Sequence, residues 1–244
     1  MPEELPPIWA DKADDEIEPE FKPDYLYTSM EPVKQQLRDG VKTFGVPAAS
    51  LSWGIDGIMK SSLLPGSEGE RQTAKLLDAL AKKTPGMFVF HSLSWPESSG
   101  DTDHIMVWKD MVVVIDTKRW KGSRKYTVTA KGGILRGTVA FKEGRVKIGY
   151  ALYAWRKRIP NAPKVMGIVT IAQEKIFVVR DKNWFKAPFR LVEFEKLEEQ
   201  LKYMMDNHKP KVDKTQASTL LYLAKLLVKP RDIMGEIINQ EALL

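Results

Sequence analysis

The segment that most constrains the fold is a short apolar run in the middle of the chain. Residues 111–115 read Met-Val-Val-Val-Ile, so no position in the run is polar. A strand that is apolar at every position is covered on both faces, whereas a strand with one wet face alternates between apolar and polar residues. We therefore expect this run to form an interior strand of a sheet that helices cover on both sides.

The neighbouring segments predict a mixed α/β order around that strand. Pro65-Gly66 is expected to break the chain before a helix that Ser67 caps, with Glu70 three residues later as in a capping box. Small hairpins are expected within 119–147, which is rich in glycine and lysine. Strands are expected at 87–93, 103–108, 111–118, 165–172 and 175–180, and helices at 150–159, 195–205, 215–228 and 233–243.

Composition excludes several classes of site. The chain has no cysteine, which excludes disulfide frameworks, thiolate zinc sites, iron–sulfur clusters and cysteine nucleophiles. It has neither a phosphate-binding loop nor a nucleophile elbow, so no ATPase or α/β-hydrolase is indicated. No apolar run approaches the roughly 20 residues of a membrane span, and the N-terminus lacks the basic-then-apolar order of a signal peptide. We expect a cytoplasmic protein without a membrane partner.

Charge is distributed unevenly along the chain. The net charge is +6, but residues 1–24 contain nine acidic and two basic side chains together with five prolines. This composition predicts a disordered acidic tail, and it leaves a charge of +13 on the rest of the chain. A body that is this basic indicates a polyanionic partner such as a nucleic acid; the alternative is a solvated basic surface without a partner.

Two carboxylates are predicted to meet across a turn at Lys109-Asp110. If this turn joins the two flanking strands, the numbers of facing residues sum to 219, and Asp103 lies opposite Asp116. Facing residues in an antiparallel pair have Cβ atoms about 4.5–5.5 Å apart on one side of the sheet. Lys118 shares that side because it follows Asp116 by two residues. The sequence thus predicts a cluster of Asp103, Asp116 and Lys118.

This cluster predicts a metal site. Two carboxylates that face each other in a buried sheet repel, so a cation must compensate. Lys118 is one candidate, but a divalent ion is the better one, because Mg²⁺ takes carboxylate oxygens together with waters and phosphate oxygens; Mn²⁺ is a second option. Such a metal beside a lysine can hydrolyse a phosphodiester, with Lys118 orienting the water or stabilising the transition state. The alternative is a structural ion-pair cluster.

Three motifs, in this order, resemble a known family. Gly66-Ser67-Glu68-Gly69-Glu70, then Asp101-Thr102-Asp103-His104-Ile105, then Val114-Ile115-Asp116-Thr117-Lys118 are similar to the nuclease-related domain, NERD, of the PD-(D/E)XK nuclease superfamily. The resemblance covers about residues 64–195. It implies a restriction-endonuclease-like mixed sheet flanked by helices and a Mg²⁺ site. It also implies that Glu70 joins Asp103, Asp116 and Lys118 at that site, with Glu70 as a further metal ligand.

This interpretation divides the chain into four parts. Residues 1–24 are the acidic tail, 25–64 a helical N-terminal extension, 65–195 the nuclease-like domain and 196–244 a helical C-terminal extension. The expected function is metal-dependent hydrolysis of DNA, with RNA open as a substrate. The alternative is a catalytically inactive nuclease-fold protein that binds DNA or acts as a scaffold. In either case, the helical termini are candidate surfaces for a protein partner.

The residues around the predicted site suggest further roles. Arg119, Lys121, Arg124 and Lys125 follow Lys118 with one tryptophan among them, so we expect contacts with a nucleic-acid backbone; the alternative is a solvated basic hairpin. His104 alternates with Asp103 along the strand. It is expected to pack on the opposite face rather than to bind metal.

Overall fold

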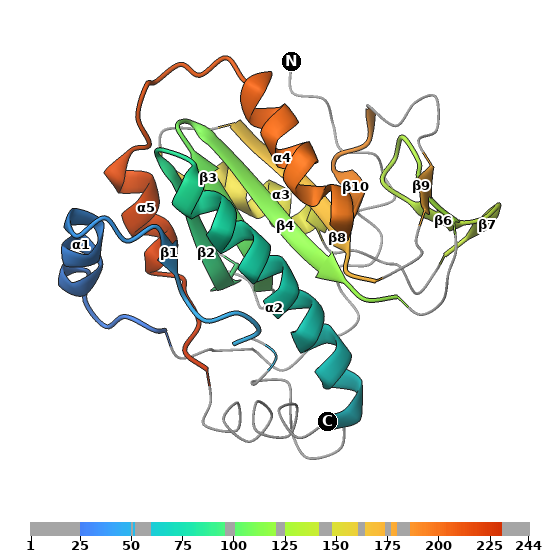
Figure 1. Ribbon diagram of the computed structural model, residues 1–244, viewed down its shortest axis with the longest axis horizontal. Coiled ribbons are helices and arrows are strands. Elements are labelled where there is room, and N and C mark those ends of the chain that lie inside the picture. Colours follow the sequence, from blue (N-terminus) through green and yellow to red (C-terminus); the bar gives the residue numbers. More distant parts are fainter. Residues whose placement is uncertain are drawn as a thin grey trace.

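A mixed sheet with helices on both faces forms the body of the protein in the computed structural model (Figure 1). The structure describes residues 25–49, 51, 60–95, 101–120, 125–141, 148–160, 164–173, 177–179 and 186–230. In spatial order, the strands are β1 (Thr43–Phe44), β2 (Met87–Ser94), β3 (Asp101–Trp108), β4 (Met111–Lys118), β8 (Lys164–Ile171) and β10 (Arg190–Glu193). Strands β2, β3 and β4 are antiparallel, and the other neighbours run parallel. The expected α/β fold with a mixed sheet flanked by helices is confirmed.

Strand β4 lies in the interior of this sheet, as its apolar run predicts. It pairs antiparallel with β3 and parallel with β8, and none of residues 111–115 is more than 1% exposed. Val112 and Val114 belong to the hydrophobic cluster on one face, while Val113 and Ile115 belong to the cluster on the other. Every position of the run is therefore apolar because both faces of β4 are buried.

The helices form a layer on each side of the sheet. Helices α2 (Lys60–Lys83) and α4 (Leu197–Asp206) lie in front of the sheet in Figure 1, and α3 (Ile148–Arg158) lies behind it. Helices α1 (Glu31–Arg38) and α5 (Ala217–Ala224) lie at the β1 side, and a short 3₁₀ turn at Phe194–Lys196 precedes α4. None of the helices within the described ranges has both the length and the apolar character required to cross a membrane.

A second, smaller sheet lies beside the main one (Figure 1). Its order is β7 (Val139–Ala140), β6 (Ile134–Arg136), β5 (Lys125–Val128) and β9 (Phe177–Val179). Strands β5, β6 and β7 form antiparallel pairs, so the expected hairpins within 119–147 are confirmed for the residues described there. Trp120, Tyr126 and Phe141 pack their rings against one another at its base.

One sequence expectation about elements was wrong, and two strands were not expected. Pro65-Gly66 does not break the chain, because α2 begins at Lys60 and continues through both residues. Within 25–64, which was expected to be a helical extension, Thr43–Phe44 joins the sheet as β1. Arg190–Glu193 pairs with β8 as β10, although no strand was expected there. The expected acidic tail at 1–24 and the helix at 233–243 lie outside the described residues.

The first and last described segments meet beside β2. Tyr25 forms a bridge with Val228, and the Leu26 N–H donates to the Leu227 carbonyl at 2.8 Å. Leu227 also forms a bridge with Leu93 of β2. The two extensions therefore hold each other against the same strand of the main sheet.

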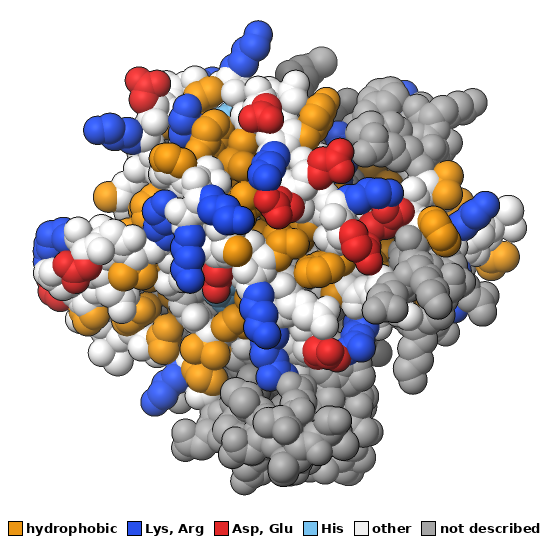
Figure 2. Space-filling view, viewed as in Figure 1, with side chains coloured by type: hydrophobic (Ala, Val, Ile, Leu, Met, Phe, Trp, Pro, Cys, Tyr) orange, Lys and Arg blue, Asp and Glu red, His pale blue; other side chains and the backbone are white. Residues whose placement is uncertain are grey.

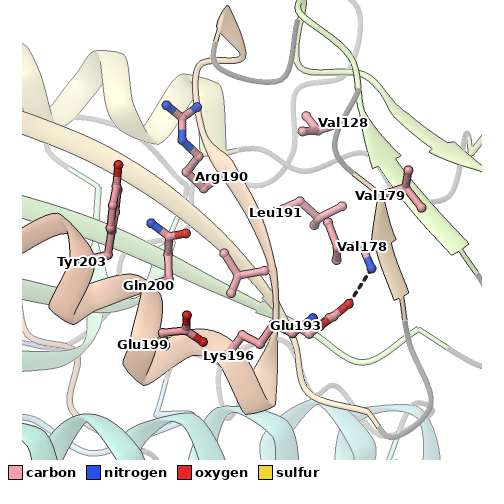
Figure 3. A pocket seen from close by; sticks show the side chains of 11 residues that line it. Val128, Val178, Val179, Arg190, Leu191, Glu193, Lys196, Glu199, Gln200 and Tyr203 are labelled. Carbon is pink, nitrogen blue, oxygen red and sulfur yellow. Dashed lines mark hydrogen bonds and ion pairs between the residues drawn. The ribbon is translucent and has the colours of Figure 1, made fainter. Parts of the chain in front are cut away.

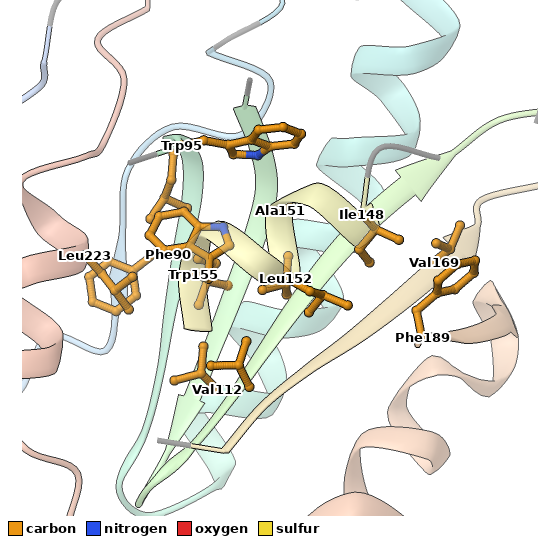
Figure 4. Close-up of a cluster of buried hydrophobic side chains, with 14 of the residues drawn as sticks. Phe90, Trp95, Val112, Ile148, Ala151, Leu152, Trp155, Val169, Phe189 and Leu223 are labelled. Carbon is orange, nitrogen blue, oxygen red and sulfur yellow. The ribbon is translucent and has the colours of Figure 1, made fainter. Parts of the chain in front are cut away.

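Trp155 anchors α3 on the sheet (Figure 4). Its side chain is fully buried, and its indole Nε1 donates to Thr102 Oγ1 at 3.1 Å. Trp155→Ala is expected to cost about 3–5 kcal/mol of unfolding free energy, because it leaves a large cavity in the core. Urea denaturation measures this loss as a lower midpoint at an unchanged slope. Tyr153→Ala, on the exposed face of the same helix, is the control and is expected to stay within about 0.5 kcal/mol. Equal losses in the two variants would contradict the anchoring role.

Candidate active site

The acidic cluster begins where the β3–β4 ladder ends. Paired residues run from Trp108–Met111 to His104–Ile115, so facing numbers sum to 219 as predicted. Beyond His104 the described strands form no further pair, and the Thr117 N–H donates instead to Asp103 Oδ2 at 2.6 Å. The register alone predicts that Asp103 faces Asp116 as a ladder pair, but the two residues are not paired in the structure. The Asp103 carboxylate instead accepts a hydrogen bond from the backbone N–H of Thr117, the residue after Asp116.

An irregularity in β2 lies beside Asp103. Pairing between β2 and β3 skips the position at which Ser92 and Asp103 would meet, within an otherwise continuous described ladder. Ser92 has a φ of 53°, in the left-handed region. As a result, Phe90 and Leu93 point into the same core cluster although they are three residues apart. Irregularities of this kind redirect side chains and end regular pairing. The irregularity at Ser92 therefore accounts for an Asp103 carboxylate that bonds to the Thr117 N–H.

A glycine allows α2 to approach β4 and so places Glu70 at the cluster. A Cβ at Gly69 would lie 3.4 Å from Thr117 Cγ2 and 3.3 Å from Ala172 Cβ, so the helix and the strand ends are in close contact. One turn further along α2, the hydroxyls of Thr73 and Thr117 are hydrogen-bonded at 3.2 Å. Glu70 follows Gly69 directly and is only 5% exposed. The close approach at Gly69 is thus what brings a helix carboxylate to the end of β4.

A cavity of about 260 Å³ opens at this end of the sheet. All four residues expected at the site line it, namely Glu70, Asp103, Asp116 and Lys118. The rest of its wall consists of Leu51, Trp95, Asp101, Thr102, Val114, Ile148 and Ala151. Apolar walls around a few convergent polar groups are typical of ligand sites. The structure therefore brings together in one cavity the three side chains that the register predicts and Glu70, which the resemblance implies.

Burial raises the pKa of each carboxyl group in the cluster. Burial and then repulsion from Asp103 raise the pKa of Glu70 well above its ordinary value. Burial and then repulsion from Asp116 raise the pKa of Asp103 to about 8. Burial also raises the pKa of Asp116, although Lys118 opposes this. Burial by itself lowers the pKa of Lys118, but attraction to Asp116 and Asp103 outweighs it and raises that pKa. The single positive charge of Lys118 is thus too small to offset the repulsion and burial that raise the pKa values of the surrounding carboxyl groups.

Two carboxylate oxygens in the cluster have no donor. Lys118 Nζ donates to Asp116 Oδ1 at 2.9 Å. Asp116 Oδ2 and Glu70 Oε2 are buried and have no hydrogen-bond partner in the described structure. Leaving such oxygens unpaired is costly, and carboxylate oxygens are the ligands that Mg²⁺ prefers. The residues present therefore fit a divalent cation.

The arrangement is open rather than a closed metal cage. Within the ranges that the structure describes, no group of three histidine, cysteine, aspartate or glutamate side chains is arranged to hold a metal ion by itself. Mg²⁺ is usually bound by one or two carboxylates and completes its shell with waters and substrate phosphates. The side chains of Asp116 and Lys118 are 20% and 32% exposed, so solvent and ligand reach them. The cavity suits a metal that shares its coordination with a substrate.

A larger cavity, of about 310 Å³, lies between β10, α4 and the small sheet (Figure 3). Val178 and Leu191 contribute apolar wall, and the carboxylate that lines the cavity at Glu193 is already occupied. It accepts a hydrogen bond from the Val178 N–H at 2.8 Å and pairs with Lys196. Because Glu193 has its partners within the fold and Glu199, the other carboxylate of this wall, is exposed, we place the candidate active site in the smaller cavity.

The basic run after Lys118 is only partly described. Arg119 is exposed and forms an ion pair with Glu68 of α2. Lys125 is exposed at the start of β5. Lys121 and Arg124 lie outside the described residues. The expected nucleic-acid contacts of all four residues stay predictions.

His104 packs on the opposite side of β3, as expected. It is fully buried, and its Nδ1 lies 2.9 Å from His91 Nδ1, while His91 Nε2 lies 3.0 Å from Asp78 Oδ1. Burial and then the neighbouring His91 lower the pKa of His104 well below its ordinary value. His104 is therefore a neutral core histidine with no place in the carboxylate cluster.

Sequence analysis missed the residues that shape the wall of the cavity. Asp101 was not included in the predicted site, yet it begins β3 and lines the cavity. Thr102 Oγ1 accepts hydrogen bonds from the indoles of Trp95 at 2.9 Å and Trp155 at 3.1 Å. No local pattern marks Thr102, Trp95 and Trp155, because segments far apart in the sequence bring them together. A signal for Asp101 did exist, since the register places it opposite Lys118.

Comparison with known proteins identifies one domain. Residues 65–147 match the model of the family described as NERD, nuclease-related domain. This segment includes all four residues expected at the site. No curated protein matches the chain. Among solved structures, SfsA of Pyrococcus furiosus in complex with Ca²⁺ is similar, with 10% sequence identity and a TM-score of 0.29. That match covers 55% of this chain and 56% of SfsA, so it spans little more than half of either protein.

Proposed function

Since residues 65–147 match the model of the nuclease-related domain, we propose that this protein is a metal-dependent nuclease that hydrolyses phosphodiester bonds in DNA. The observation that carries the proposal is the cavity at the end of β4, which is lined by four carboxylates and one ammonium group. Raised carboxyl pKa values together with a specific charge partner in a cavity are typical of functional sites. The metal is expected to be Mg²⁺, with Mn²⁺ as a substitute.

The carboxylates would hold the metal. Asp103 and Asp116 come from adjacent strands and line the same cavity, and Glu70 adds a third carboxylate from α2. In this proposal, Asp103 and Asp116 bind the ion, and Glu70 completes its shell or holds a second ion. When bound, the ion lowers the pKa of a water and neutralises charge on the phosphate. The Thr117 N–H donates to Asp103 Oδ2, so the other oxygen of Asp103 would bind the metal.

Lys118 would act on the water and on the phosphate. Attraction to Asp116 and Asp103 raises its pKa, so in the metal-free protein Lys118 is a cation near neutral pH. As a cation it can orient the attacking water through a hydrogen bond, and it can stabilise the negative charge that develops on the phosphate. Its bond to Asp116 would hold the ammonium beside an ion bound by that carboxylate.

Cleavage by the full chain tests the proposal. We expect end-labelled DNA to be cut in Mg²⁺ and to stay intact in EDTA, with Mn²⁺ restoring activity. Matched DNA and RNA strands of the same sequence identify the substrate. Isothermal titration calorimetry with Mg²⁺ alone should detect binding, because the unpaired carboxylate oxygens do not need a substrate to take up the ion. Absence of both cleavage and Mg²⁺ uptake would overturn the proposal.

The alternative function predicts a different pair of results. A catalytically inactive nuclease fold would bind DNA with an affinity that falls as salt rises, since phosphate contacts release counterions. It would show no heat of Mg²⁺ binding. The basic charge of residues 25–244 supports nucleic-acid binding under either function. Calorimetry therefore separates the two.

A further inference from the structure

Asp101 is a fourth carboxylate of the active-site cavity, beside the three that are proposed to bind the metal. It begins β3, it is exposed, and it lines the cavity together with Glu70, Asp103 and Asp116. Asp101 and Asp103 share a side of the sheet because they are two residues apart in one strand. Besides burial, repulsion from Asp101 raises the pKa of each of the other three carboxyl groups. All four carboxyl groups therefore lie close enough to influence one another.

The oxygens that the fold leaves without donors are too widely spread for a single ion. Asp103 Oδ2 accepts from the Thr117 N–H, and Asp116 Oδ1 accepts from Lys118. Glu70 is only 5% exposed, it lines the cavity, and its Oε2 has no hydrogen-bond partner. Among the residues that the structure describes, no three acidic side chains are arranged around one ion. One ion is thus expected to take two of the four carboxylates, which leaves the other two for a second ion.

Charge in the cavity also favours two ions. With its four carboxyl groups ionised and Lys118 protonated, the cavity has a net charge of −3. One divalent ion leaves a charge of −1, and a phosphodiester would bring a further negative charge into a partly buried site, which is costly. Two ions balance the carboxylates, the ammonium group and the phosphate together. The side of the molecule covered by α2 and α4 differs, because basic and acidic side chains are interspersed on it (Figure 2).

From this arrangement we propose that Glu70 and Asp101 bind a second divalent cation, beside the ion at Asp103 and Asp116. The inference rests on the proposed function and adds to it a second metal position with Asp101 as a ligand. Because Asp101 is exposed whereas Glu70 and Asp103 are buried, Asp101 lies at the open side of the cavity, where waters and a phosphate can complete the shell of the ion. Paired metal ions stabilise both the attacking and the leaving oxygen of a phosphodiester.

Counting the Mn²⁺ ions bound by the full chain tests the inference without any cleavage. Free Mn²⁺ gives an EPR signal that is lost on binding, so a titration yields the number of ions per chain; calorimetry with Mg²⁺ yields the same number for the expected native metal. We expect two ions for the wild type and one for Asp101→Asn, an exposed isosteric change that should keep the fold. Glu70→Gln should also bind one ion. The double variant should still bind one, because both residues serve the same ion.

Asp206→Asn is the matched control, and it should bind two ions. Asp206 is exposed at the end of α4 and does not line the cavity. Two ions in Asp101→Asn, or none in the double variant, overturn the inference.

The same counts separate this inference from the proposed function. If the wild type binds one ion and cuts DNA in Mg²⁺, the inference fails while the proposed function stands. If the wild type binds two ions and Asp101→Asn binds one, but no nucleic acid is cut, the proposed hydrolysis fails and the second metal position stands. If the wild type binds no ion, both fail.

Discussion

Asp116→Ala is expected to reduce Mg²⁺-dependent cleavage at least about a thousand-fold while the protein stays folded. The substitution removes one of the two strand carboxylates proposed to bind the ion, and it also removes the partner of Lys118. Stabilisation by a catalytic metal is worth several kcal/mol, and about 4 kcal/mol corresponds to a factor of about a thousand in rate. The measurement is the initial rate of cleavage of end-labelled DNA at saturating Mg²⁺.

A matched variant separates catalysis from a general effect of removing an acid. Asp206 is exposed at the end of α4, on the other face of the sheet. Asp206→Ala should therefore cleave at the wild-type rate. Thermal melting of both variants shows whether each is folded at the assay temperature. If folded Asp116→Ala cuts DNA as fast as Asp206→Ala, the assignment of the site to the end of β4 is wrong.

Stability of the metal-free protein is expected to fall as pH rises from about 7 to about 8, and Mg²⁺ should remove this fall. Burial raises the pKa of Asp103 from 3.8 to about 8. Between these values the folded state holds a proton that the unfolded state has lost, so raising the pH favours unfolding until the folded pKa is passed. At about 1.4 kcal/mol per pKa unit, the total effect of one such group amounts to several kcal/mol. A bound divalent cation favours the ionised form of the carboxyl group and so removes this fall.

The choice of pH range follows from a second buried group. The lowered pKa of His104 makes stability rise with pH, because the unfolded histidine binds a proton that the buried, folded histidine does not bind. Its contribution makes stability rise with pH up to the ordinary histidine pKa of 6.5, and this rise is complete above about pH 7. Denaturant titrations between about pH 7 and 9, with and without Mg²⁺, therefore report on the carboxylates.

Replacing the aspartate identifies the group responsible. Asp103→Asn keeps an oxygen that can accept from the Thr117 N–H but cannot ionise. We expect this variant to show a flatter dependence of stability on pH and little stabilisation by Mg²⁺. Asp206→Asn should keep the wild-type dependence. A slope in Asp103→Asn equal to that of the wild type would show that other groups carry the pH dependence.

The strand half of the site could be predicted because two local features determine it. The turn at Lys109-Asp110 sets the register, and the uninterrupted apolar run places β4 in the sheet interior. The exact position of Asp103 could not be predicted, because it depends on the irregular backbone of Ser92 in the adjacent strand. A serine carries no local signal for such a conformation. Neighbouring strands, and not the segment itself, decide where the pairing stops.

The helix half of the site required the resemblance to a family. Local rules assign Ser67 and Glu70 to a capping box, but α2 begins earlier, and the Ser67 hydroxyl accepts a hydrogen bond from Arg71 at 2.9 Å. What places Glu70 at the cavity is the close approach of α2 at Gly69, which is a property of tertiary packing. Strands β1 and β10 escaped prediction for a related reason. They have two and four residues, too few to show periodicity, and they are ordered by the long strands beside them.

The pairing of β4 with β8 has a practical consequence for experiments on a fragment that contains only residues 65–147. The family segment ends at residue 147, whereas β8, which bonds to β4 along its whole length, lies beyond that point. A fragment cut to the family boundaries would leave the backbone N–H and C=O groups on one edge of β4 unpaired, and it would expose the apolar surfaces that α3 and α4 cover. Unpaired strand edges bind the strands of other chains, so we expect the fragment to aggregate rather than to fold. Biochemical work therefore needs at least residues 25–230, which keep the contact between the first and last described segments.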